Sequence, residues 1–126
     1  MNKTAYRILV IDDDADIGIM IKMILEYSGY FVMVSVRGEQ AEELIKNNKI
    51  DLLIMDMLLS GTNGTDICKR VKQNPATSNL PVIMISAHPN ARQTCIDAGA
   101  DDFISKPFDM EDILSKINAH ITSNVN

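Results

Sequence analysis

The sequence of 126 residues contains two cysteines, no tryptophan and fewer basic than acidic residues. Cys68 and Cys95 lie far apart in the chain, and two isolated thiols make neither a disulfide framework nor a zinc site. Twelve Lys and Arg face seventeen Asp and Glu, which gives a net charge of −5 and no basic stripe for phosphates. Direct nucleic-acid binding is therefore not expected.

Long hydrophobic runs are also missing. A membrane-spanning helix needs about 20 apolar residues, and no run in this chain approaches that length. No basic-then-apolar leader precedes the first apolar segment, so we expect a cytoplasmic protein with no membrane partner. Apolar residues make up 46% of the chain, which is enough for the packed core of one domain.

Short apolar runs alternate with segments of helical periodicity along the whole chain. The β-branched runs suit parallel strands that are buried on both faces, and the intervening segments repeat apolar residues every three or four positions. Expected strands cover Ile8–Ile11, Tyr30–Val36, Asp51–Met55, Val82–Ile85 and Asp102–Ser105, and expected helices cover Ala15–Ser28, Gly38–Asn48, Thr65–Gln73, Asn90–Ala98 and a last segment capped by Asp109 with Ile113, Leu114, Ile117 and Ile121 as its apolar stripe.

Five strand–helix repeats predict an α/β fold with a doubly wound, five-stranded parallel sheet and five helices, of the flavodoxin-like type. The predicted strand order is 2-1-3-4-5, with its switch point between the first and third strands. The repeats fill the chain, so we expect one domain over residues 1–126 and no output domain.

Polar residues follow four of these strands. Asp12 and Asp13 follow the first strand and Asp56 the third, and the carboxyl ends of parallel strands share one edge of the sheet. Clustered carboxylates repel one another unless a cation neutralises them. Carboxylate oxygens are ligands that suit Mg²⁺, for which Mn²⁺ can substitute.

Ser86 and Lys106 follow the fourth and fifth strands and add a hydroxyl and an ammonium to the same edge. Together these groups fit an attacking carboxylate, a metal and two groups that hold phosphoryl oxygens. Taken singly, Asp13 could be a helix cap, Asp56 a turn residue and Lys106 a surface lysine. Their joint placement at strand ends of one fold favours a site.

Four blocks of the chain, in this order, resemble the receiver domain of two-component response regulators, the CheY-like family. They are Ile8–Asp14, Asp51–Met57 with Gly64 eight residues after Asp56, Pro81–Ala87 and Gly99–Phe108. The resemblance implies that Asp56 accepts a phosphoryl group from a sensor histidine kinase or a phosphotransfer protein. Beyond its own phosphorylation and dephosphorylation, it implies no enzyme activity.

The same resemblance assigns roles to the residues around Asp56. Asp13, Asp56 and the backbone carbonyl of Leu58 would ligate Mg²⁺, and Asp12 would act partly through water. Lys106 would pair with the phosphoryl group, Ser86 would swing toward it, and Phe103 would move inward behind Ser86. The fourth helix, fifth strand and fifth helix would then signal to an unknown downstream protein, from a monomer or a phosphorylation-dependent dimer. A cis Lys106–Pro107 bond is also implied.

The chain departs from the family pattern near the site. Ser60 stands where the family usually has proline, which predicts a more mobile loop. Ser86 and Gly99 are closer in sequence than is usual, which shortens the fourth helix region and puts the usual output surface in doubt.

Leu58 and His88 are candidates to modulate phosphoryl lifetime, because the residues two positions after Asp56 and Ser86 would flank the path of attacking water. For His88, a solvated loop residue is an equally good interpretation. His120 is expected to be solvated at a helix end, and Met20 and Met23 to face the core.

Two other functions compete with the signalling module. A metal-dependent phosphohydrolase with Asp56 as nucleophile would usually have a second carboxylate two residues later, where this chain has Leu58. A pseudo-receiver that binds partners without phosphorylation would not need Asp12, Asp13 and Lys106 together. Both alternatives are less favoured by the residues present.

Overall fold

The computed structural model describes residues 6–123, so the two ends of the expected domain, 1–5 and 124–126, lie outside the described residues. Five parallel strands form one sheet in the order β2-β1-β3-β6-β7, which is the predicted 2-1-3-4-5 order counted along the chain. The strands are β1 (Arg7–Ile11), β2 (Phe31–Ser35), β3 (Leu52–Asp56), β6 (Val82–Ser86) and β7 (Asp102–Ser105). The predicted doubly wound fold is confirmed.

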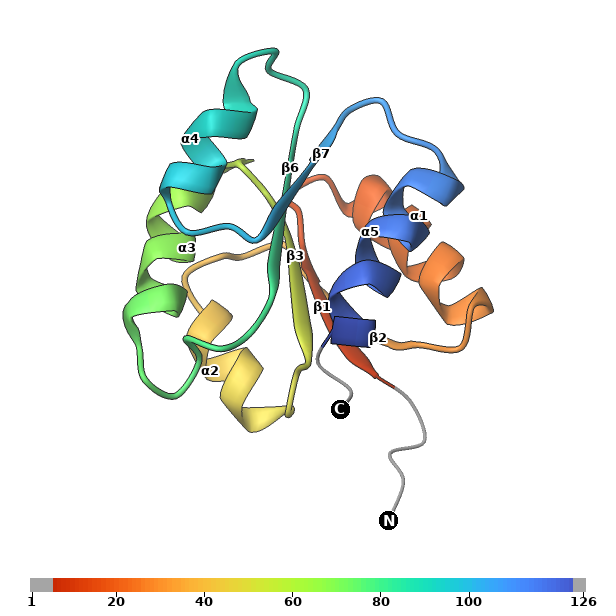
Figure 1. Cartoon of the computed structure of the whole chain (residues 1–126), viewed down its shortest axis with the longest axis horizontal. Helices are drawn as coiled ribbons and strands as arrows, with labels where there is room; N and C mark the ends of the chain where they lie inside the picture. Colours follow the sequence, from red (N-terminus) through yellow and green to blue (C-terminus); the bar gives the residue numbers. More distant parts are fainter. Residues whose placement is uncertain (1–5, 124–126) are drawn as a thin grey trace.

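Helices cover both faces of this sheet (Figure 1). The helices are α1 (Ala15–Tyr27), α2 (Ala41–Asn47), α3 (Gly64–Gln73), α4 (Ala91–Asp97) and α5 (Met110–Ser123). In Figure 1, α1 and α5 lie on one side of the sheet and α2, α3 and α4 lie on the other. None of the helices in the described part of the chain is long and apolar enough to cross a membrane.

The strands supply two cores because successive side chains point to opposite faces. Leu9 and Ile11 belong to one buried cluster, which includes side chains of α2, α3 and α4. Ile8 and Val10 belong to the other, which includes side chains of α1 and α5. Burial on both faces explains why these strands read as continuous apolar runs.

Helix ends follow the local sequence signals. Asp14 is the N-cap of α1, since its carboxylate accepts the backbone N–H groups of Asp16 and Ile17. The first and fourth helices are each followed by a glycine with positive φ, Gly29 at 98° and Gly99 at 106°. This is the left-handed conformation that terminates a helix at low cost for glycine.

The segment after β3 contains two short strands where a loop was predicted. Leu58–Leu59 (β4) and Thr62–Asn63 (β5) form an antiparallel hairpin, and Ser60 lies in its tight turn. Gly61 occupies the turn with φ of 74°. Gly64 opens α3 and donates its N–H to the Met57 carbonyl at 2.7 Å. A Cβ at this position would collide with the Asp56 carbonyl, so the close approach requires glycine.

Several local predictions are corrected by the packing. Met20 and Met23 are exposed on α1, by 44% and 65%, because Ile21 and Leu25 already fill the face against the sheet. The second helix begins at Ala41 rather than Gly38, and Gly38 packs against the side chains of Leu59 and Ile67.

Candidate functional site

Three carboxylates meet at the carboxyl edge of the sheet, as the sequence predicts. Asp12 and Asp13 follow β1, and Asp56 is the last residue of the neighbouring strand β3. Each offers one oxygen, and the three oxygens lie within 4.8 Å of one another. Strand pairing in register creates this cluster, because β1 and β3 are adjacent and end together.

Asp12 is buried, with 1% of its surface exposed. Its Oδ1 accepts the backbone N–H of Asp14 at 2.9 Å, but its Oδ2 has no hydrogen-bond partner within residues 6–123. Burial, more than the nearby charges of Asp56 and Asp13, raises the pKa of Asp12 above its usual 3.8. A buried carboxylate oxygen that accepts no hydrogen bond and lies beside two further acids is what a bound cation would satisfy.

Lys106 brings a positive charge into this cluster. Its Nζ lies 3.1 Å from Oδ2 of Asp56 and 3.7 Å from Oδ2 of Asp12. The backbone N–H of Lys106 donates to the Ser86 carbonyl at 2.9 Å, which fixes the lysine beside the end of β6. The following Lys106–Pro107 bond is cis, as the family resemblance predicts.

One lysine cannot balance three ionised carboxylates. The cluster carries a formal charge of −2 when Asp12, Asp13 and Asp56 are ionised against Lys106. A hard divalent cation would neutralise this charge, and its preferred ligands are carboxylate oxygens, backbone carbonyls and water. The donor set therefore fits Mg²⁺.

Asp13 is held from the other side by the β4–β5 hairpin. Its Oδ2 accepts both the hydroxyl of Ser60 at 2.7 Å and the backbone N–H of Ser60 at 3.1 Å. Asp13 is thus not the cap of α1, which is Asp14. Sequence reasoning missed the role of Ser60, because the two residues are 47 positions apart and no local pattern links them.

Ser86 and His88 are joined at the start of the β6–α4 connection. Ser86 is 3% exposed, and its Oγ accepts the backbone N–H of His88 at 3.0 Å. His88 is exposed, but its Nδ1 accepts the N–H of Asn90 at 3.1 Å, which orients the ring beside α4.

Phe103 is already buried in this structure, with 6% of its surface exposed. It belongs to the same core cluster as Ala91 and Cys95 of α4, whose small side chains leave room for the ring. The family resemblance predicts that Phe103 moves inward on phosphorylation, but in this conformation the ring already lies inside the core.

A second charged cluster joins β7 to α5. Asp102 accepts Lys116 Nζ at 3.0 Å and pairs with Nε2 of His120 at 2.9 Å. Burial opposes ionisation of Asp102, but hydrogen bonds from His120, the Phe103 backbone and Lys116 hold its pKa below 3.8. The expectation that His120 is solvated was wrong, because α5 packs its last turns over the start of β7.

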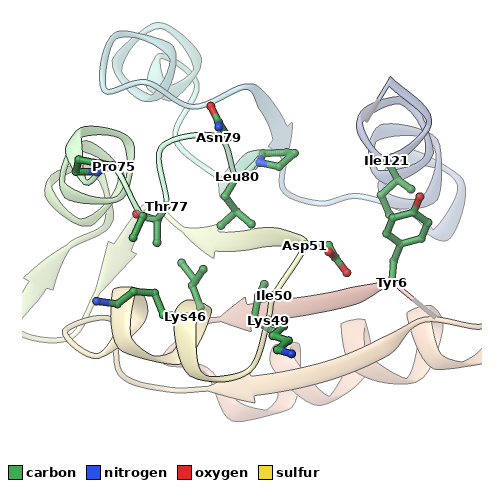
Figure 2. A pocket seen from close by; sticks show the side chains of 13 residues that line it. Tyr6, Lys46, Lys49, Ile50, Asp51, Pro75, Thr77, Asn79, Leu80 and Ile121 are labelled. Atoms are coloured by element: carbon green, nitrogen blue, oxygen red, sulfur yellow. The ribbon is translucent and has the colours of Figure 1, made fainter. Parts of the chain in front are cut away.

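A hollow of about 500 Å³ lies at the opposite end of the sheet from the acids. Figure 2 shows Tyr6, Asp51 and Leu80 around it, together with Lys49 and Ile121. Its polar side chains are not clustered as the acids are, so its size alone does not make it the centre of the chemistry.

Comparison with known proteins agrees with this geometry. The model of the response regulator receiver domain matches residues 8–118. The chain belongs to this family. It is 35% identical over 115 residues to the DNA-binding dual master transcriptional regulator RpaA of Synechocystis. The matched residues make up 90% of this chain and 48% of that protein. The chain therefore spans about half the length of that curated relative.

Solved structures give the same result. A crystal structure of a candidate response regulator from Chloroflexus aurantiacus has a TM-score of 0.89 and 34% identity, covering 94% of this chain and 98% of that chain. The receiver domain of a sensor histidine kinase from Pseudomonas aeruginosa, solved with magnesium in its active-site cleft, has a TM-score of 0.86 and 23% identity, with coverage of 94% and 98%. At that identity the second match supports the fold of this receiver domain.

Proposed function

We propose that this receiver domain accepts a phosphoryl group on Asp56 in a Mg²⁺-dependent reaction and thereby switches a binding surface. The observation that carries the proposal is the ammonium of Lys106, 3.1 Å from Asp56, beside a buried Asp12 oxygen that lacks a hydrogen bond. A structural ion pair alone would not bring two further carboxylates to the same place.

Asp12, Asp13 and Asp56, with the backbone carbonyl of Leu58, are the proposed Mg²⁺ ligands. The magnesium described for the Pseudomonas receiver domain supports this choice of metal. When bound, Mg²⁺ would neutralise charge on the carboxylates and on phosphoryl oxygens. Mn²⁺ has similar ligand preferences and is expected to substitute.

In the proposed step, a carboxylate oxygen of Asp56 attacks the phosphorus of a phosphohistidine. The new P–O bond forms as the P–N bond breaks, and the leaving imidazole keeps the electron pair and takes up a proton. Lys106 is placed to hold phosphoryl oxygens as their charge moves, which is the usual contribution of a cationic side chain to phosphoryl transfer. The chain's contribution is positioning and charge stabilisation of its own modification, not turnover of other substrates.

The switch begins at Ser86. For its Oγ to reach the phosphoryl group, it must either give up the His88 backbone N–H or carry the β6–α4 connection with it. Either change reaches the start of α4, because the His88 carbonyl also accepts the N–H of Ala91. Phe103, packed in the same core as Ala91, would respond by repacking rather than by entering from outside.

We assign the donor as a sensor histidine kinase or a phosphotransfer protein, since receiver domains interact with histidine kinases. The recipient of the signal is an unidentified protein that contacts the α4–β7–α5 surface, with the domain as a monomer or a phosphorylation-dependent dimer. The DNA-binding relative supports a regulatory pathway, but the acidic charge of this chain gives no reason for the domain itself to bind DNA. A cytoplasmic location suits these partners.

The test is incubation with acetyl phosphate and Mg²⁺, followed by intact mass measurement. We expect a gain of one phosphoryl group in the wild type and none in Asp56→Asn or in the presence of EDTA. Steady release of phosphate at high turnover would instead indicate a phosphohydrolase. An unchanged mass with metal present would indicate a pseudo-receiver and would contradict the proposal.

Leu58 and His88 are proposed to set how long the phosphoryl group lasts. Leu58 lies two residues after Asp56 and its side chain is 61% exposed. The His88 ring is oriented by the backbone N–H of Asn90. The proposal for His88 fails if wild type and His88→Ala lose the phosphoryl group at equal rates.

A further inference from the structure

Ser60 makes two contacts with a proposed metal ligand. Its hydroxyl and its backbone N–H both donate to one oxygen, Oδ2 of Asp13, at 2.7 and 3.1 Å. Asp13 is exposed, so without these donors its carboxylate would be free to rotate in solvent. The β4–β5 hairpin holds Ser60 in place, because Leu59 and Thr62 pair on either side of the Ser60–Gly61 turn.

The two contacts limit how Asp13 can bind a cation. An ionised carboxylate has about four lone-pair sites on its two oxygens. Ser60 occupies Oδ2 twice, so a cation that used both oxygens of Asp13 would have to displace one or both donors. The arrangement therefore favours a single metal–oxygen contact from Asp13.

This restriction discriminates between cations. Mg²⁺ is small, takes six ligands in near-ideal octahedral geometry and keeps several waters, so one oxygen from each carboxylate suits it. Ca²⁺ takes six to eight oxygens and commonly binds a carboxylate through both. We propose that Ser60 is a positioning residue that holds Asp13 as a one-oxygen ligand and so favours Mg²⁺ over Ca²⁺ at this site. The inference rests on the metal site of the proposed function.

Position 60 offers graded variants. Ser60→Thr keeps both donors, and Ser60→Ala removes only the hydroxyl. Ser60→Pro removes the hydroxyl and the N–H together. A positive φ at the second turn residue, as at Gly61, is typical of a type II turn, in which proline is common at the first position. Ser115→Ala, on the exposed surface of α5, is a matched control for loss of a serine hydroxyl.

The experiment measures Mg²⁺ and Ca²⁺ affinities separately, by titration monitored through backbone amide NMR shifts of the full chain. We expect the ratio of Mg²⁺ to Ca²⁺ affinity to fall by about threefold in Ser60→Ala and about tenfold in Ser60→Pro, the low end for loss of a group that orients a metal ligand. Ser60→Thr and Ser115→Ala should keep the wild-type ratio. If Ser60 had a purely structural role, its loss would weaken the binding of Mg²⁺ and Ca²⁺ equally and leave the affinity ratio unchanged.

An unchanged ratio in Ser60→Ala would overturn the inference while leaving the proposed metal site intact. If the wild type bound neither cation, the metal site of the proposed function would fail and this inference with it. Unfolding curves in EDTA report whether each variant folds, and if Ser60→Pro does not, the comparison of Ser60→Ala with Ser60→Thr decides.

Discussion

Acidic residues lie at both ends of the parallel strands, and their contacts differ between the two ends. At the starts of the strands, Asp51 accepts the N–H of Arg7 at 2.8 Å and Asp101 accepts the N–H of Val82 at 2.8 Å. Lys72 also donates to Asp101 at 2.6 Å. Each of these carboxylates meets the first residue of a neighbouring strand and helps to fix the sheet.

At the carboxyl ends, the acids face one another instead. Asp12 is buried with one oxygen that accepts no hydrogen bond, and Lys106 is the counter-charge of Asp12 and Asp56, with Asp13 beside them. The acids at the starts of the strands are held by donors from neighbouring strands, whereas the carboxyl-edge cluster keeps an excess of negative charge and one buried oxygen without a hydrogen bond, as a cation site would. Hollows of similar volume, about 500 and 510 Å³, lie at the starts of the strands and beside Lys106, so cavity size does not distinguish the two edges, whereas charge imbalance does.

The largest effect is expected from removing the positive charge of Lys106 at the carboxyl edge of the sheet. Lys106→Met should lower the rate of phosphorylation by acetyl phosphate by about 100-fold, because a positioned charge is lost where phosphoryl charge moves. Lys72→Met, which breaks the pair with Asp101 at the other edge, is the matched control and should keep the rate within about twofold of wild type. Similar rates for the two variants would remove the distinction between the edges. Timed intact-mass measurements give both rates.

Neutralising an acid at the structural edge should reduce stability without affecting the chemistry. Asp101→Asn weakens two charge-assisted hydrogen bonds, and since the Lys72 pair is partly exposed we expect a loss of about 1 kcal/mol in the free energy of unfolding. Urea unfolding measures the loss, and intact mass after acetyl phosphate treatment should show unchanged phosphorylation. A defect in phosphorylation comparable to that of Lys106→Met would contradict this assignment.

The corresponding Asp-to-Asn substitution at the carboxyl edge, at Asp12, should raise the free energy of unfolding rather than lower it. The pKa of Asp12 is raised in the folded state, so its contribution to the stability of the metal-free protein falls as pH rises from below 3.8 through the raised pKa. Asp12→Asn removes a buried, repelled charge and should stabilise the metal-free protein at pH 7 by roughly 0.5–1 kcal/mol.

Unfolding in EDTA and in Mg²⁺ checks this prediction for Asp12. Added Mg²⁺ should stabilise the wild type and have little effect on Asp12→Asn, because only the folded wild type binds it well. A destabilised Asp12→Asn in EDTA would mean that Asp12, like Asp101, serves the fold.

The sequence determined the sheet and the identity of the main site residues. Continuous β-branched runs such as Ile8–Ile11 specify strands that are buried on both faces, and the apolar stripes of the helices specify what covers them. Once the strand order is fixed, residues that directly follow the strands must gather at one edge, so the sequence alone predicts that Asp12, Asp56 and Lys106 lie together.

Only the tertiary structure decided which groups touch across the chain. Ser60 contacts Asp13 across 47 positions, and His120 contacts Asp102 because α5 packs against β7. Met20 and Met23 also satisfy helical spacing, yet the sheet face admits only one stripe of α1. Periodicity and strand ends are local properties that a sequence displays, whereas side-chain pairing depends on distances that only packing sets.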